Sequence, residues 1–198
     1  MANYQNNTER HPLKPFLPKG ARILILGSFP PKIERWSMEW FYPNWINDMW
    51  RIVGYIFFAD KRYFEVKADR SFNKNRIIDF CTNRGIALYD TASEIRRLKD
   101  NASDKFLEIV VPTNICQLLS DIIDCKAVIT TGQKAAEEVA KQFCCPIPQV
   151  GEFIEVTVLN RTIRFWRMPS TSRAYPLSIE KKAEFYHRMF LSEAILER

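Results

Sequence analysis

Two segments of the sequence hold most of the residues that could bind a ligand or carry chemistry. The first, residues 27–47, mixes many aromatic side chains with two amides, Asn44 and Asn47. An amide that hydrogen-bonds the edge of a base, beside an aromatic ring that stacks on its face, is how proteins hold a base that has left a duplex. This segment therefore predicts a pocket for a planar ring.

The same residues also have ordinary structural interpretations. Trp36, Trp40 and Trp50 could form a hydrophobic cluster under a long loop. Asn44 could be a turn residue in the sequence YPNW, and Asn47 could cap the helix that follows it. Both interpretations stay open at the level of sequence.

The second segment is MPSTSRAYP, residues 168–176, which follows a predicted strand directly. Ser170, Thr171 and Ser172 offer hydroxyl groups and backbone amides to a phosphate, and Arg173 is long enough to reach into a duplex. A structural turn with capping hydroxyls between prolines would give the same pattern.

Arginines gather just before and within this segment. Arg161, Arg164, Arg167 and Arg173 lie in a stretch without a single acid, in a chain whose formal net charge is +6. A local excess of cations is how proteins approach a phosphate backbone, although a solvated strand edge would look similar.

Common catalytic motifs are absent. The sequence has no G-x-x-x-x-G-K-[ST] phosphate loop, no G-x-G-x-x-G motif and no G-x-S-x-G nucleophile elbow. His11 lies in the N-terminal segment and His187 in a predicted helix, and the cysteines lack the spacing of metal ligands. We therefore expect no metal or cofactor, and a reaction that depends on positioning and electrostatics rather than on a strong base.

Length and composition fit an ordinary globular protein. The chain has 198 residues, of which 46% are hydrophobic, and its longest apolar runs are far shorter than a membrane span. Its start contains no apolar signal region, and its five cysteines are odd in number and lack a C-x-x-C pair. We expect a cytoplasmic protein that is neither secreted nor bound to a membrane.

Periodicity predicts alternating strands and helices. Strands are expected at 21–26, 86–89 and 127–131 and in a hairpin over 155–166 with its turn at 160–161; helices are expected at 47–58, 76–83, 115–123, 133–143 and 178–196. Residues 1–20, which contain three prolines, read as an N-terminal arm that is wrapped on the surface or disordered, followed by a single domain over 21–198.

Such alternation is typical of a mostly parallel sheet between helical layers. Ligands bind to these sheets where the carboxyl ends of the strands open into loops. Residues 27–47, 90–104, 132–133 and 169–175 should therefore converge on one crevice.

Three blocks of the sequence resemble the uracil-DNA glycosylase superfamily, above all its mismatch-specific, thymine-DNA and hypoxanthine-DNA branches. They are LGSFPP (26–31), FYPNWINDMWRIVG (41–54) and RMPSTSRAYP (167–176), in matching order and spacing. The segments ALYD (87–90) and AVITTG (127–132) fall where that family has its middle strands. The resemblance covers residues 21–190.

The resemblance implies a three-layer α/β/α sandwich around a short, mostly parallel four-stranded sheet. It implies hydrolysis of the N-glycosidic bond of a base flipped out of DNA, without a cofactor. By the same resemblance Tyr42 stacks on the base, the serine-rich block grips the phosphate backbone, and Arg173 wedges into the gap. The base-binding residues that we expect are Gly27, Ser28, Phe29, Tyr42 and Asn47.

One departure from the family pattern concerns the water-activating residue. The common branches carry an Asn or Asp shortly after the glycine that matches Gly27, whereas this chain has Ser28 and Phe29. The hypoxanthine-type branch uses an Asn of the later block instead, which matches Asn44. We expect Asn44 to orient the attacking water, while backbone N–H groups near Ser28 stabilise the expelled base anion.

The leading hypothesis is a monomeric DNA glycosylase of base excision repair that acts on uracil or hypoxanthine, including mismatched bases. The second is a catalytically inactive nucleic-acid-binding module on the same fold, suggested by the missing side chain after Gly27. A third is a protein that binds a free nucleobase or nucleotide.

Overall fold

The computed structural model describes residues 8–98 and 106–196. Three parts of the predicted segments lie outside these residues: 1–7 of the arm, 99–104 of the crevice loop and 197–198 at the end of the domain. Its main sheet has five strands in the order β5, β2, β8, β10, β9. Their bounds are Ile86–Asp90 for β5, Ile23–Gly27 for β2, Ala127–Thr131 for β8, Arg161–Met168 for β10 and Glu152–Val158 for β9.

The predicted α/β class with a mostly parallel sheet is confirmed. Strands β5, β2, β8 and β10 are parallel to one another, and only β9 is antiparallel to its neighbour β10. The predicted count of four strands was wrong, because both members of the 155–166 hairpin join the sheet. The turn of that hairpin is also one residue earlier than expected, since Leu159 and Asn160 are the two residues with positive φ.

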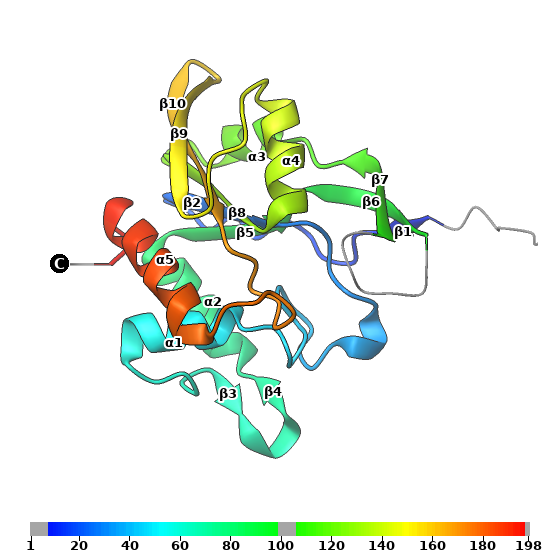
Figure 1. Ribbon diagram of the computed structural model, residues 1–198, viewed down its shortest axis with the longest axis vertical. Coiled ribbons are helices and arrows are strands. Elements are labelled where there is room, and N and C mark those ends of the chain that lie inside the picture. The colour runs from blue at the N-terminus through cyan, green and yellow to red at the C-terminus, as the bar shows by residue number, and fades with distance from the viewer. Residues whose placement is uncertain (1–7, 99–105, 197–198) are drawn as a thin grey trace, which may run out of the picture.

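Helices cover both faces of this sheet, which gives the three predicted layers (Figure 1). Helices α3 and α4 lie on one face, while α1, α2 and α5 lie on the other. The bounds are Met49–Phe58 for α1, Lys74–Arg84 for α2, Ile115–Asp121 for α3, Gln133–Gln142 for α4 and Ile179–Ser192 for α5. None of the described helices is long and apolar enough to cross a membrane.

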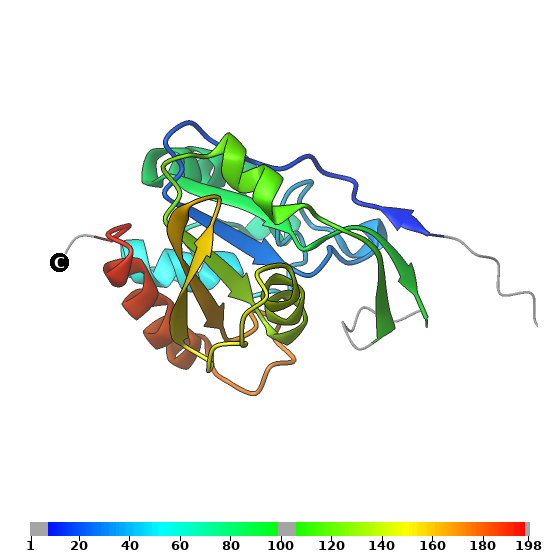
Figure 2. The same cartoon turned by 90° about the horizontal axis from the view of Figure 1, so that it is seen from above.

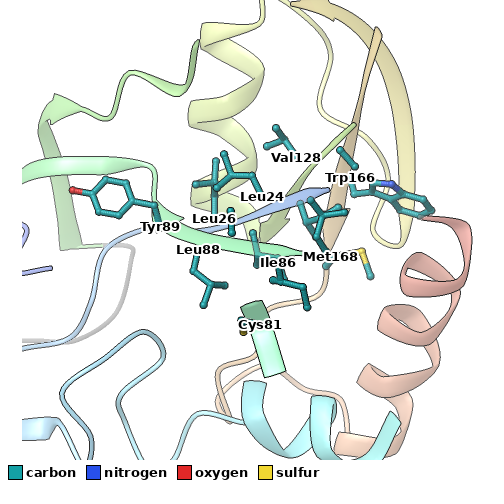
Figure 3. Packing of buried hydrophobic residues seen from close by; sticks show 14 of the residues in the cluster. Leu24, Leu26, Cys81, Ile86, Leu88, Tyr89, Val128, Trp166 and Met168 are labelled. Atoms are coloured by element: carbon teal, nitrogen blue, oxygen red, sulfur yellow. The ribbon is translucent and has the colours of Figure 1, made fainter. Parts of the chain in front are cut away.

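The central strands are buried along their whole length. Every residue of β2, β5 and β8 is buried, as expected for apolar runs covered on both faces. Leu24, Leu88 and Val128 from these strands belong to the same core as Cys81 of α2 (Figure 3). This core fixes the carboxyl ends of the strands, where the site lies.

Helix ends follow local signals in the sequence. Gly85, with φ of 67°, ends α2 in the left-handed conformation that glycine adopts most easily. Ser178 caps α5 by accepting a hydrogen bond from the backbone N–H of Lys181. The predicted helix 178–196 nevertheless ends at Ser192.

A second sheet was not predicted from the sequence. Strands β6 (Ala92–Arg97) and β7 (Leu107–Pro112) form a hairpin that pairs with β1 (Glu9–Arg10), and this sheet projects to one side of the main one (Figure 2). The expected crevice loop after β5 is therefore partly a strand. The minor elements are β3 (Glu65–Val66), β4 (Ser71–Phe72) and two 3-10 turns at Ile33–Arg35 and Lys67–Asp69.

The N-terminal arm, over the residues described, lies against the domain. Its strand β1 pairs antiparallel with β6, and Phe16 forms an isolated bridge with Leu88 of β5. Arg97 of β6 donates to the carboxylate of Glu9 at 2.9 Å. These contacts hold the arm along the edge of the main sheet that leads to the site.

All five cysteines are free thiols. Cys81 and Cys125 are buried, and burial raises the pKa of Cys125 to about 12. Cys144, in contrast, is exposed.

Candidate active site

A pocket of about 530 Å³ opens at the carboxyl edge of the main sheet. Its lining includes Gly27, Asp90 and Thr131 from the ends of β2, β5 and β8, together with the loop that follows β10. Of the four predicted crevice segments, 27–47 and 169–175 each contribute several lining residues and 90–104 contributes Asp90, whereas residues 132–133 are not part of the lining. Nine of the predicted site residues line this pocket, namely Gly27, Ser28, Phe29, Tyr42, Asn44, Asn47, Ser170, Thr171 and Ser172.

At the floor of the pocket the side chain of Asp90 lies close to the backbone of Gly27. Asp90, the last residue of β5, lies opposite Gly27, the last residue of β2. A Cβ atom added to Gly27 would lie 2.3 Å from the Oδ1 atom of Asp90, a clash that Asp90 could relieve only by moving its side chain. Only glycine at position 27 allows this carboxylate to lie over the end of β2.

His11, from the N-terminal arm, holds this carboxylate. The Nε2 atom of His11 lies 2.8 Å from Oδ2 of Asp90, and the imidazole is 2% exposed. The ring packs edge-on against Phe29 at 5.2 Å and in a tilted arrangement against Tyr89 at 4.6 Å between centroids. The N-terminal arm therefore contributes a residue to the site.

Tyr42 lies above this floor in a strained backbone conformation, with φ of 52°. Its hydroxyl is 3.1 Å from Oγ1 of Thr131. Burial, together with the negative charge of Asp90, raises the pKa of Tyr42 well above its usual value. The side chain is therefore a neutral phenol that can both donate and accept a hydrogen bond in the pocket.

The two asparagines that line the pocket use their oxygens locally. Oδ1 of Asn44 accepts a hydrogen bond from the N–H of Ile46 at 3.0 Å, and Oδ1 of Asn47 accepts one from Met49 at 2.9 Å. The turn interpretation is therefore confirmed for Asn44, whereas the N-cap of α1 is Asp48, so Asn47 hydrogen-bonds the first residue of the helix without being its cap. Within residues 8–98 and 106–196 neither side-chain nitrogen has a protein partner, so both remain available to a ligand.

The serine-rich loop after β10 is joined to the start of α1. Asn47 forms an isolated bridge with Ser172, and the N–H of Asp48 donates to the carbonyl of Thr171 at 2.8 Å. Ser170 accepts a hydrogen bond from the N–H of Ser172. Thr171 is buried and Ser172 is exposed, so the hydroxyls differ in their access to a phosphate.

A buried cluster of charged side chains connects the start of α1 to the serine-rich loop. Lys182 of α5, which is fully buried, donates to Oδ2 of Asp48 at 3.0 Å and to the carbonyl of Ser172 at 2.8 Å. Arg173, whose side chain is 51% exposed, lies 3.3 Å from Oδ1 of the same carboxylate. To wedge into a duplex, Arg173 would have to leave Asp48.

The other arginines of this stretch are engaged elsewhere. Arg161 donates to the carbonyl of Leu119 at the end of α3, and Arg167 donates to that of Pro148. Arg164 pairs with Glu155 and Glu193. None of the three lines the pocket, so the cation-rich strand serves mainly to tie β10 to its neighbours.

The tryptophans of the first loop divide between core and surface. Trp40 and Trp50 are buried and stack at 6.0 Å, which confirms the hydrophobic-cluster interpretation for these two. Trp36 is half-buried and donates to the carbonyl of Pro31. Among the described residues there is no group of three His, Cys, Asp or Glu side chains that could hold a metal ion.

Comparison with known proteins finds similarity in structure rather than in sequence. No protein-family model matches the chain, and no curated protein matches it. The solution NMR structure of a "putative Uracil DNA glycosylase" from Methanosarcina acetivorans matches with a TM-score of 0.61 at 17% sequence identity. The match covers 95% of this chain and 99% of that one. At this level of identity the likeness establishes a shared fold.

Proposed function

We propose that this protein is a monofunctional DNA glycosylase that hydrolyses the N-glycosidic bond of a deaminated base, uracil or hypoxanthine, including mismatched ones. The observation that carries this proposal is the pocket, where aromatic rings, amides and a carboxylate meet at the carboxyl edge of the sheet. Its volume of about 530 Å³ is in the range of pockets that take small ligands. The fold, shared with a protein described as a "putative Uracil DNA glycosylase", supports the same reaction class.

Each part of the pocket has a role in this proposal. Gly27, Ser28 and Phe29 contact the flipped base with Asn47, and Tyr42 stacks on it or hydrogen-bonds its edge. Asn44 orients the attacking water with its free amide nitrogen. Ser170, Thr171 and Ser172 border the pocket on the opposite loop, where they contact the phosphates, and Arg173 enters the gap left by the base.

The partner is DNA that contains a deaminated or mismatched base. We propose that the protein works as a cytoplasmic monomer in base excision repair, without a cofactor. The reaction needs only water, which attacks C1′ of the sugar while the base leaves with the electron pair of the glycosidic bond.

The test uses labelled duplexes that carry uracil, hypoxanthine or a G·T mismatch, each treated with alkali after incubation with the protein. Strand cleavage at a lesion, and none in the undamaged duplex, would establish the enzyme and name its base. Binding of every duplex without any cleavage would refute the proposal in favour of an inactive nucleic-acid-binding module.

Replacement of Asn44 tests the water-orienting role. We expect Asn44→Ala to lower the single-turnover cleavage rate by about 100-fold while DNA affinity is retained, because a misplaced nucleophile costs about two orders of magnitude. Asn114→Ala is the matched control, since Oδ1 of Asn114 also accepts a backbone N–H but caps α3. A rate unchanged in Asn44→Ala would remove this residue from the role.

A further inference from the structure

Asp90 is the one carboxylate among the described residues that line the pocket. Its side chain is 11% exposed, so it is largely withdrawn from solvent but reachable from the pocket. Burial of an unpaired carboxylate is costly, and such a group is retained only where it is held by donors or has a task.

His11 satisfies one oxygen of this carboxylate and leaves the other unoccupied. Because a carboxylate only accepts hydrogen bonds, the Nε2 atom of His11 must carry the proton that it shares with Oδ2. Nδ1 of the same ring is anchored to the backbone of Leu13, at 3.1 Å from its N–H and 2.9 Å from its carbonyl. The ring is thus fixed in both position and orientation.

The second oxygen of Asp90 lies over Gly27, which also lines the pocket. Oδ1 occupies the space over Gly27 in which a Cβ atom would stand, on the same side as the hydroxyl of Tyr42. Within the described parts of the chain Oδ1 has no hydrogen-bond donor. Tyr42 directs its hydroxyl to Thr131 rather than to this oxygen.

We infer that Asp90 is a catalytic residue that accepts a proton from the attacking water, and that His11 is the positioning residue that holds it, an inference that rests on the proposed function. The lone pair of the water forms the new bond to C1′, and the C1′–N bond breaks with its electron pair going to the base. The proton of the water passes to Oδ1 of Asp90 and from there to the expelled base anion. The carboxylate also faces the positive charge that develops on the sugar.

Holding the arm in place is not a sufficient explanation of this pair. The arm is already attached by the pairing of β1 with β6, by the bridge between Phe16 and Leu88, and by the ion pair of Arg97 with Glu9. A purely structural pair would also not require a glycine at position 27 to keep Oδ1 at the pocket.

The test compares single-turnover cleavage and DNA affinity in the full chain and its variants. Asp90→Asn keeps the shape of the side chain but removes the proton acceptor, and we expect its rate to fall by about 10³-fold with an unchanged Kd. His11→Ala should lower the rate by about tenfold at unchanged Kd, and His11→Gln, which can still donate to Oδ2, should recover most of that loss. Asp60→Asn is the control, since Asp60 is an exposed carboxylate that, within the described residues, accepts only the N–H of Arg62.

The outcomes separate this inference from the function on which it rests. Full activity of Asp90→Asn alongside an active parent protein would overturn the role of Asp90 and leave the glycosylase intact. Failure of His11→Gln to exceed His11→Ala would overturn the positioning role of His11. A parent protein that releases no base from any duplex would overturn both proposals. Circular dichroism and binding to duplex DNA establish that each variant is folded.

Discussion

Asp48 and Asp90 are both buried carboxylates at the same edge of the sheet, yet their oxygens are used differently. Both oxygens of Asp48 face cations, Lys182 on one side and Arg173 on the other. Among the described residues Asp90 has a donor on Oδ2 alone, and its Oδ1 lies over Gly27 in the lining of the pocket. The difference shows that a fully paired carboxylate holds loops together, whereas a half-paired one at a pocket is available for chemistry.

The largest expected effect comes from breaking the Asp48 pair. In Lys182→Met the carboxylate of Asp48 would stay buried without its main partner, and the carbonyl of Ser172 would lose its donor. We expect the free energy of unfolding to fall by about 3–5 kcal/mol, as measured by urea denaturation.

His11→Ala at Asp90 is the counterpart of Lys182→Met at Asp48. It also removes one partner of a buried Asp, but Asp90 can still be solvated through the pocket, so we expect a smaller loss of stability than in Lys182→Met. Equal losses in the two variants would contradict the distinction between the two pairs.

Gly27→Ala tests the close approach at the floor of the pocket. A Cβ atom 2.3 Å from Oδ1 must displace Asp90, and we expect a loss of about 1–3 kcal/mol in unfolding free energy together with loss of cleavage. Gly20→Ala is the control, because Gly20 has open space around its Cα but a φ of +73°. That variant should lose about 1 kcal/mol from backbone strain with its cleavage rate intact.

The smallest effect on stability is expected at the exposed member of the Asp48 cluster. Arg173→Ala should change the unfolding free energy by less than about 1 kcal/mol, since the pair is half-exposed and Lys182 remains. It should, however, reduce the slope of log affinity for DNA against log salt by about one. Arg164→Ala, on the far part of β10, should leave that slope unchanged, and an equal reduction there would refute a specific role for Arg173.

Most of the main sheet could be predicted from the sequence, because its signals are local. Continuous apolar runs identified β2, β5 and β8. The expected end of one helix at 83 and start of another at 178 lie within one residue of the observed bounds, where Gly85 ends α2 and Ser178 caps α5. The hairpin of β6 and β7 was missed, since ASEIRR alternates only weakly and its partner strand LEIVVP follows an intervening segment.

Only part of the site could be predicted, because only some of its residues are marked by local signals in the sequence. Loops that follow strands could be identified one by one, and Asn44 and Tyr42 do line the pocket. The contact between His11 and Asp90 joins residues 79 positions apart, and no local pattern reports such a pairing. Two signals were nevertheless present: Asp90 directly follows a buried apolar run, and His11 is one of only two histidines.

The close approach of β2 and β5 also constrains how this chain can evolve. While Asp90 is present, any side chain at position 27 meets its Oδ1 atom, so a substitution at position 27 is tolerated only after position 90 has become smaller. Loss of Asp90, in turn, removes the obstacle that kept position 27 a glycine. The two positions should therefore show epistasis in a double-mutant library, with the order of the two changes deciding which lineages survive.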